Sequence, residues 1–183
     1  MGRHASAYER ELKGLLEGDP EAWGRYGRGL RPAERYAARA ARRARFLVVR
    51  AAGSFGFDLV ALRREFAFPL EVKASRAGTI HFSAASGRAA AQLAAHRKAV
   101  AEVGLAVLYA YRRVGLRNDE CWRIFIVPTA GLDGHLGVLR RRLPPIDRTR
   151  DGNAVLRWMD GMPLAEFLEM VHFLTDRGSE PAA

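Results

Sequence analysis

The residues best suited to chemistry lie in two short β-prone segments that are close neighbours in the chain. Asp58 opens the first segment, Glu71, Val72 and Lys73 lie in the second, and the polar link 63–65 joins them as a hairpin. Because side chains alternate along a strand, Glu71 and Lys73 leave the same face, and pairing can bring Asp58 against them. Burying these charges is costly unless they pair or bind metal. The pattern therefore predicts either a metal site or a buried ion pair of Lys73 with one of the acids.

A helix expected at residues 5–17 is the first element that can add to this site. Apolar residues recur there at helical spacing and form one stripe, and Glu9 lies at its edge. A carboxylate in that position can reach inward toward a site. The alternative is that Glu9 only keeps the helix solvated, as Glu11 and Glu17 would.

Residues 18–45 differ in composition from the helix before them. A Gly-Asp-Pro sequence and three further glycines are expected to break the helix, and Pro32 suits the first turn of a new one. Arg35, Arg39 and Arg42 recur at i, i+4 and i+7, which gives the new helix a basic face. That face can lie along a phosphate backbone or be the solvated side of an amphipathic helix, and the sequence leaves both open.

The rest of the pattern is that of a mixed α/β domain. Pro69 removes a backbone donor from the second hairpin strand, so we expect that strand to be irregular or unpaired there. A helix and two more strands follow, which predicts a mixed central β-sheet flanked by helices. The expected elements are a strand at 46–49, the hairpin, a helix that Ser83 or Ser86 caps and that runs to about Val103 before Gly104, and strands at 105–112 and 121–127.

Composition restricts the function further. A chain of 183 residues, 49% of them apolar, can build one domain with a core, and its charge of +10 favours an anionic partner, most simply nucleic acid. Nearly all basic residues are arginine, which makes Lys73 stand out. The single Cys121 excludes an intramolecular disulfide, the phosphate loop of NTPases is absent, and no segment has the pattern of a membrane span or signal peptide. We therefore expect a protein of the reducing cytoplasm with no membrane partner.

Four segments together resemble the archaeal-type Holliday junction resolvases of the PD-(D/E)-x-K nuclease superfamily. They are Tyr8-Glu9-Arg10-Glu11-Leu12, Val49-Arg50-Ala51-Ala52-Gly53-Ser54, Asp58-Leu59-Val60-Ala61 and Glu71-Val72-Lys73, in the family's order. The resemblance covers about residues 5–17 and 46–127. It implies a restriction-endonuclease-like fold and a homodimer that binds branched DNA, a four-way junction, in which each subunit cuts one strand with magnesium.

The resemblance also implies roles for individual residues. The matching positions are Glu9, Asp58, Glu71 and Lys73 as catalytic groups, Ser54 as an assisting group, and Arg10 and Arg50 as DNA contacts. The sequence departs from the family in the long arm at 18–45, in a longer helix after Ser83 and in the tail beyond Pro128.

The residue types fit phosphodiester hydrolysis, which needs an activated water and neutralisation of an anionic transition state. The carboxylates of Glu9, Asp58 and Glu71, with the Val72 carbonyl, can hold one or two magnesium ions, and manganese is expected to substitute. Two ions would clamp the attacking and leaving oxygens. Lys73 can orient the water or neutralise charge at the phosphate.

We therefore expect residues 1–127 to form a nuclease domain with an arginine-rich insertion at about 18–45, in which Arg35, Arg39 and Arg42 bind DNA. Residues 128–183 are expected to be an extension that packs on the domain or on a dimer interface. The alternatives are a restriction-type or repair endonuclease of the same fold, and a non-catalytic DNA-binding protein. The apolar surface of a symmetric dimer is expected from residues 105–109, 122–126 and the tail helix with Leu164, Phe167, Leu168 and Val171.

Overall fold

The computed structural model describes residues 2–41, 43–51, 56–64, 66–83, 87–116 and 120–176. Its helices are α1 (Gly2–Glu17), α2 (Pro20–Gly27), α3 (Pro32–Ala41), α4 (Arg88–Val103), α5 (Gly134–Arg142) and α6 (Leu164–Asp176), with a 3-10 turn, η2, at Trp158–Asp160. Its strands are β1 (Leu47–Arg50), β2 (Leu59–Arg63), β3 (Phe66–Ser75), β4 (Thr79–Phe82), β5 (Leu108–Arg113), β6 (Trp122–Ile126), β7 (Asp147–Arg148), β8 (Ala154–Arg157) and β9 (Met162–Pro163).

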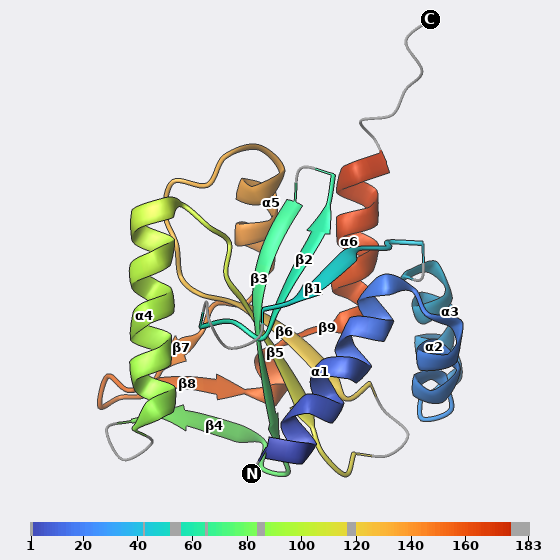
Figure 1. The fold of residues 1–183 in the computed structure, drawn as a ribbon, viewed down its shortest axis with the longest axis horizontal. Coiled ribbons are helices and arrows are strands. Elements are labelled where there is room, and N and C mark those ends of the chain that lie inside the picture. Colours follow the sequence, from blue (N-terminus) through green and yellow to red (C-terminus); the bar gives the residue numbers. More distant parts are fainter. Residues whose placement is uncertain are drawn as a thin grey trace, which may run out of the picture.

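A six-stranded mixed sheet forms the centre of the molecule (Figure 1). Its order is β1-β2-β3-β5-β6-β9, in which β3 and β5 run parallel while the other neighbours are antiparallel. A second sheet has the order β4-β8-β7 and is antiparallel. The predicted α/β class, with a mixed central sheet flanked by helices, is confirmed, whereas β4 and the second sheet were not expected.

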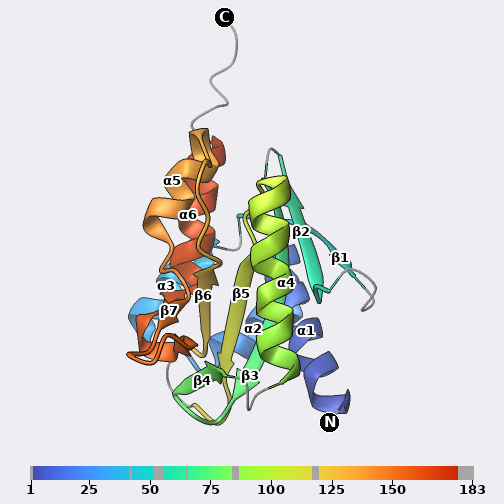
Figure 2. The ribbon, with the colours of Figure 1, turned by 90° about the vertical axis from the view of Figure 1, so that its left-hand side faces the viewer.

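Two apolar layers pack on opposite faces of the central sheet. Helices α1, α2, α3 and α6 lie on one side, and α4 with the second sheet lies on the other (Figures 1 and 2). Alternation along the strands assigns each side chain to a face: Phe68 and Leu70 of β3 join the first layer, and Tyr109 of β5 joins the second. Glu71 and Lys73 have the opposite parity to Leu70 and therefore lie on the α4 face.

The arm between α1 and β1 contains two helices instead of one. The Gly-Asp-Pro sequence separates α1 from α2 as predicted, and α2 ends at Gly27, but α2 runs through Gly24, so that glycine does not break the helix. Asp19 caps this helix by accepting the N–H of Glu21 at 2.8 Å, and Trp23 is buried against the core. Helix α3 begins at Pro32, as predicted, and packs against α6.

The predicted hairpin is present, but Pro69 does not interrupt it. Strand β3 is continuous, and Pro69 lies opposite Val60 in the antiparallel register. The Leu70 carbonyl accepts the N–H of Asp58, so the backbone of Leu70 faces β2 and the nitrogen of Pro69 faces the other edge. Pairing with β5 begins only at Leu70, so the missing donor costs no bond to that strand.

Helix α4 ends where the sequence predicted and begins differently. Gly104 closes it in the left-handed conformation, with φ of 71°. Its first cap is Gly87, which offers no side-chain hydrogen bond, so Ser83 is not the cap, and Ser86 lies outside the described residues.

The apolar segments expected at a dimer interface lie in the core instead. Strand β9 pairs with β6, and α6 packs against β6 and β9, so residues after 128 cover the surface that the sequence left open. Across the described chain no helix is long and apolar enough to span a membrane. The side chains of Leu108, Tyr109, Trp122, Ile124, Leu164, Phe167, Leu168 and Val171 are each at most 1% exposed.

Candidate functional site

The hairpin opens just before β2, and there it brings three of the predicted site residues together. The Asp58 carboxylate accepts the backbone N–H of Val72 at 2.7 Å, which extends the pairing of the two strands by one rung. Since the N–H and C=O of a strand residue point the same way, the Val72 carbonyl is directed to the same edge as Asp58. The Asp58 carboxylate is thus held beside the backbone between Glu71 and Lys73.

Glu71 is the most deeply buried of these acids, at 3% exposed. Lys73 Nζ donates to Glu71 Oε1 at 2.6 Å and to the Gln92 side-chain oxygen at 2.9 Å. Glu71 Oε2 is buried and accepts no hydrogen bond from any described residue. Burial raises the pKa of Glu71 to about 7 even though the Lys73 charge opposes the rise, and the negative charge of Asp58 adds to it.

The two acids influence each other's protonation. Burial raises the pKa of Asp58, the N–H of Val72 opposes this, and the nearby charge of Glu9 adds to it. The negative charge of Asp58 in turn adds to the rise in the pKa of Glu71. Such a pair favours any positive species that neutralises it, whether a proton or a metal cation.

The charge of Glu9 reaches Asp58, but the Glu9 carboxylate is paired with another residue. Glu9 extends from α1, on the other side of the sheet, and its carboxylate pairs with the Arg50 guanidinium at 2.6 Å. Among the residues that the structure describes, no three His, Cys, Asp or Glu side chains form a group that can hold a metal ion. The predicted cluster of three carboxylates is therefore not preformed, because Arg50 holds Glu9 and Lys73 holds Glu71.

Two side chains that the sequence analysis missed fix the loop before Asp58. The Gly56 carbonyl accepts from Gln92 Nε2 at 3.2 Å and lies 2.7 Å from His96 Nε2. Because a carbonyl only accepts, His96 Nε2 must carry a hydrogen. Gln92 therefore contacts both Lys73 and this loop. The two side chains lie at i and i+4 on an alanine-rich helix, a spacing that places both on one face and is the signal that could have found them.

His96 is itself held from two sides. Its Nδ1 lies 2.8 Å from the Tyr109 hydroxyl, and the Phe57 ring stacks on the imidazole at 4.5 Å. Burial lowers the pKa of His96, while its bond to Gly56 opposes this. Tyr109 lies directly opposite Glu71 in the parallel register of β3 and β5. His96 is therefore hydrogen-bonded to the residue next to Glu71 in the sheet.

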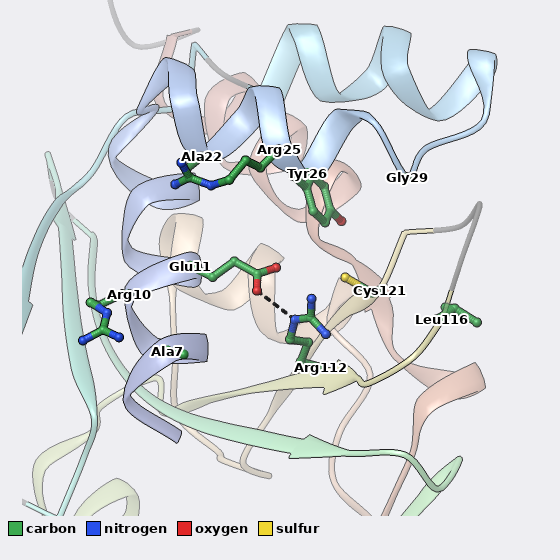
Figure 3. Close-up of a pocket in the computed structure, with 10 residues that line it drawn as sticks. All are labelled: Ala7, Arg10, Glu11, Ala22, Arg25, Tyr26, Gly29, Arg112, Leu116 and Cys121. Carbon is green, nitrogen blue, oxygen red and sulfur yellow. Dashed lines mark hydrogen bonds and ion pairs between the residues drawn. The ribbon is translucent and has the colours of Figure 1, made fainter. Parts of the chain in front are cut away.

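The predicted DNA-contacting arginines lie in three places. Arg50 is the partner of Glu9. Arg10 lines a cavity of about 550 Å³ between α1, α2 and the ends of β5 and β6 (Figure 3). Arg35 and Arg39 lie with Arg28 around a groove of about 300 Å³ between α2 and α3, and none of the described residues that line it is acidic. Two further predicted residues, Arg42 and Ser54, lie outside the described residues.

Comparison with known proteins finds a distant structural likeness. No protein-family model matches the chain, and no curated protein matches its sequence. Among solved structures, it is similar to Hjc, a Holliday junction resolvase from the archaeal hyperthermophile Archaeoglobus fulgidus, with a TM-score of 0.41 and 20% identity. That match covers 68% of this chain and 89% of the archaeal one.

Proposed function

We propose that the protein is a metal-dependent endonuclease of the PD-(D/E)-x-K type that cuts branched DNA, with the four-way junction as its substrate. The observation that carries this proposal is the cluster at the open end of the hairpin: Asp58 fixed to Val72, and Glu71 and Lys73 paired beside them. A buried acid with a raised pKa destabilises the folded state when it is ionised. In such a cluster it is therefore more often a functional feature than a stabilising one.

The donor set fits a hard divalent cation. Asp58, Glu71 and the Val72 carbonyl supply oxygen ligands, and Glu71 Oε2 is a buried oxygen that none of the described residues satisfies. Glu9 completes the set if it exchanges Arg50 for the cation. Magnesium, or manganese in its place, would supply an activated water and neutralise negative charge on the phosphate.

The chain's own residues then position the substrate. Lys73 carries a positive charge beside Glu71 and is aimed by its hydrogen bond to Gln92, so it can neutralise a phosphate oxygen or orient the attacking water. Arg50 and Arg10 are proposed to bind the DNA backbone. In the reaction, the water oxygen bonds to phosphorus while the bond to the leaving oxygen breaks, and that oxygen takes up a proton.

Paired cuts on a junction need two sites related by symmetry, so we propose a homodimer. Its surface is not the one expected from sequence, since those residues are buried. The outer face of β1 and β2 is the alternative: Leu47 is 64% exposed, Val49 50% and Leu62 37%. Leu47 pairs with Leu62 and Val49 with Val60 across the strands, which makes one apolar strip beside the hairpin.

Cleavage of DNA by an Asp58 variant tests the proposal. Wild type and Asp58→Asn are incubated with magnesium and with matched-length duplex, flap and four-way DNA. The variant should lose cleavage and keep or strengthen DNA binding, because one negative charge near the phosphate is gone. Asp151→Asn, a change at an exposed turn, is the control and should cut like wild type.

The substrate panel also separates the alternatives. Cuts in duplex alone would favour a restriction-type or repair nuclease, and binding without any cut would favour a non-catalytic DNA-binding protein. A variant at Asp58 that cuts at the wild-type rate would show that the site is wrongly assigned.

A further inference from the structure

The cavity that Arg10 lines has a charged end and an apolar end. In Figure 3, Arg10 and Arg25 lie on the left, Tyr26, Cys121 and Leu116 lie on the right, and the ion pair of Glu11 with Arg112 lies between them. The volume of about 550 Å³ lies within the range of small-ligand sites. Its lining suits a ligand that carries charge at one end only.

Among the described residues of this lining, Glu11 is the one acid, and it is already paired within the protein. Glu11 accepts from Arg112 Nε at 2.9 Å and from Trp122 Nε1 at 3.1 Å, so both of its oxygens have partners. The Arg112 guanidinium also lies over the Tyr8 ring, with its carbon 4.7 Å from the ring centre. Glu11 and Arg112 therefore neutralise each other at the centre of the cavity.

The two arginines at the charged end are much less constrained. Arg10 is exposed and forms no hydrogen bond or ion pair with the described residues. Arg25 contacts Glu21 at 3.4 Å, but the two side chains are 62% and 85% exposed. Such exposed pairs contribute little and are readily replaced. Guanidinium groups bind phosphate oxygens in a bidentate geometry, so a phosphate is the group that fits this end.

The other end offers a surface for a flat apolar group. Tyr26 and Cys121 are each 8% exposed, and both line the cavity together with Leu116. A nucleotide joins a phosphate to a flat base, and bases commonly bind on aromatic and apolar side chains. A base paired within a duplex cannot enter such a cavity, whereas an unpaired one can.

We propose that this cavity binds one unpaired nucleotide of a DNA strand, with its phosphate at Arg10 and Arg25 and its base beside Tyr26. The proposal rests on the proposed function for its choice of DNA as the partner. Branch points and strand ends are where such nucleotides occur, so the cavity would distinguish these from continuous duplex.

Filling the cavity tests the proposal without changing any charge. Ala7 lines the cavity from α1, so Ala7→Leu occupies its space with a residue that favours helix. Binding of a fluorescent single strand and of a matched duplex is measured by anisotropy in EDTA. Ala7→Leu should weaken single-strand binding about tenfold and leave duplex binding unchanged. The control, Ala95→Leu on the exposed side of α4, should change neither.

A second variant keeps the test valid if Ala7→Leu does not fold. Arg25→Ala should weaken single-strand binding more than duplex binding, whereas Arg141→Ala, which removes an equal charge on α5, should weaken the two alike. Free deoxyadenosine monophosphate at millimolar concentration should compete with the single strand. Equal competition by inorganic phosphate would overturn the nucleotide proposal, as would equal effects of Ala7→Leu on the two DNAs.

The only cysteine supplies an independent readout. Burial raises the pKa of Cys121 to about 11, so a small thiol reagent is used at pH 9 and at a concentration at which the free protein reacts within an hour. The single strand should slow this reaction and the duplex should not. Equal reaction rates in the presence of the two DNAs would overturn the proposal. All of these measurements are made without metal, so they stand or fall separately from DNA cleavage.

Discussion

Replacing Glu71 by glutamine keeps the size of the side chain and removes a charge that the fold holds at a cost. The pKa of Glu71 rises from an ordinary 4.5 to about 7, so the folded state binds this proton more tightly than the unfolded state. The free energy of unfolding contributed by Glu71 therefore falls as pH rises from about 4.5 to about 7, and stays low above that.

The size of the effect follows from the same change. A rise of this size in the pKa lowers the free energy of unfolding by about 3 kcal/mol once Glu71 is ionised. This figure already includes the attraction of Lys73, because the pKa reports the sum of all contributions. A glutamine can still accept a hydrogen bond from Lys73 through its side-chain oxygen. We expect Glu71→Gln to be more stable than wild type by about 1–3 kcal/mol at pH 8, and to match it at pH 4.5.

Urea unfolding in EDTA at pH 4.5 and pH 8 measures the two differences. Glu102→Gln is the control, because Glu102 is 61% exposed and its carboxylate is paired only weakly with Lys98, at 3.7 Å from Nζ. It should show no pH-dependent gain. A stability difference for Glu71→Gln that is equal at both pH values, or a variant less stable at pH 8, would refute the reasoning about Glu71.

Two further predictions concern the loop and the dimer. His96→Phe keeps a ring against Phe57 but loses the bond to Gly56, so we expect cleavage to slow about tenfold with little change in DNA affinity. His96→Gln can donate to the same carbonyl and should recover part of the cleavage rate. An equal loss of rate in both variants would argue against a positioning role for His96. Val49→Glu places like charges at the proposed dimer interface, so light scattering should give the mass of a monomer. The control is Met159→Glu, at a residue that is 76% exposed elsewhere, and it should leave the wild-type mass. A Val49→Glu variant that stays dimeric would show that the outer face of β1 and β2 is not the interface.

The parts of the fold that depend on local rules could be predicted from sequence. Alternation placed Glu71 and Lys73 on one face, and the hairpin brought Asp58 to them. Pro32 marked a helix start because its fixed φ suits the first turn, and Gly104 marked a helix end because glycine readily adopts the left-handed conformation. Each of these features depends on a few neighbouring residues, so no long-range packing had to be known.

The parts that depend on distant packing could not be predicted. Gln92 and His96 become site residues only because α4 lies across the sheet next to β3 and β5. Gly24 remains helical because Trp23, its neighbour, is buried against the core. The apolar strands looked like an interface because nothing in their own sequence shows that a later strand and α6 cover them. The charge of Glu9 was foreseen near Asp58, but its pairing with Arg50 was not.

The contacts of α6 have a consequence for the order in which the chain is made. This helix leaves the ribosome after α1 to α5, yet it packs against α3, and hydrogen bonds from Arg63 and Arg64 to Thr175 join it to the site hairpin. Until it emerges, the apolar faces of α3 and β6 have no cover, and such faces attract chaperones, proteases and other unfinished chains. Helix α3 and strand β6 therefore stay partly uncovered until α6 has been made, and a chain that stops after β6 should be degraded in the cell rather than accumulate as a smaller nuclease.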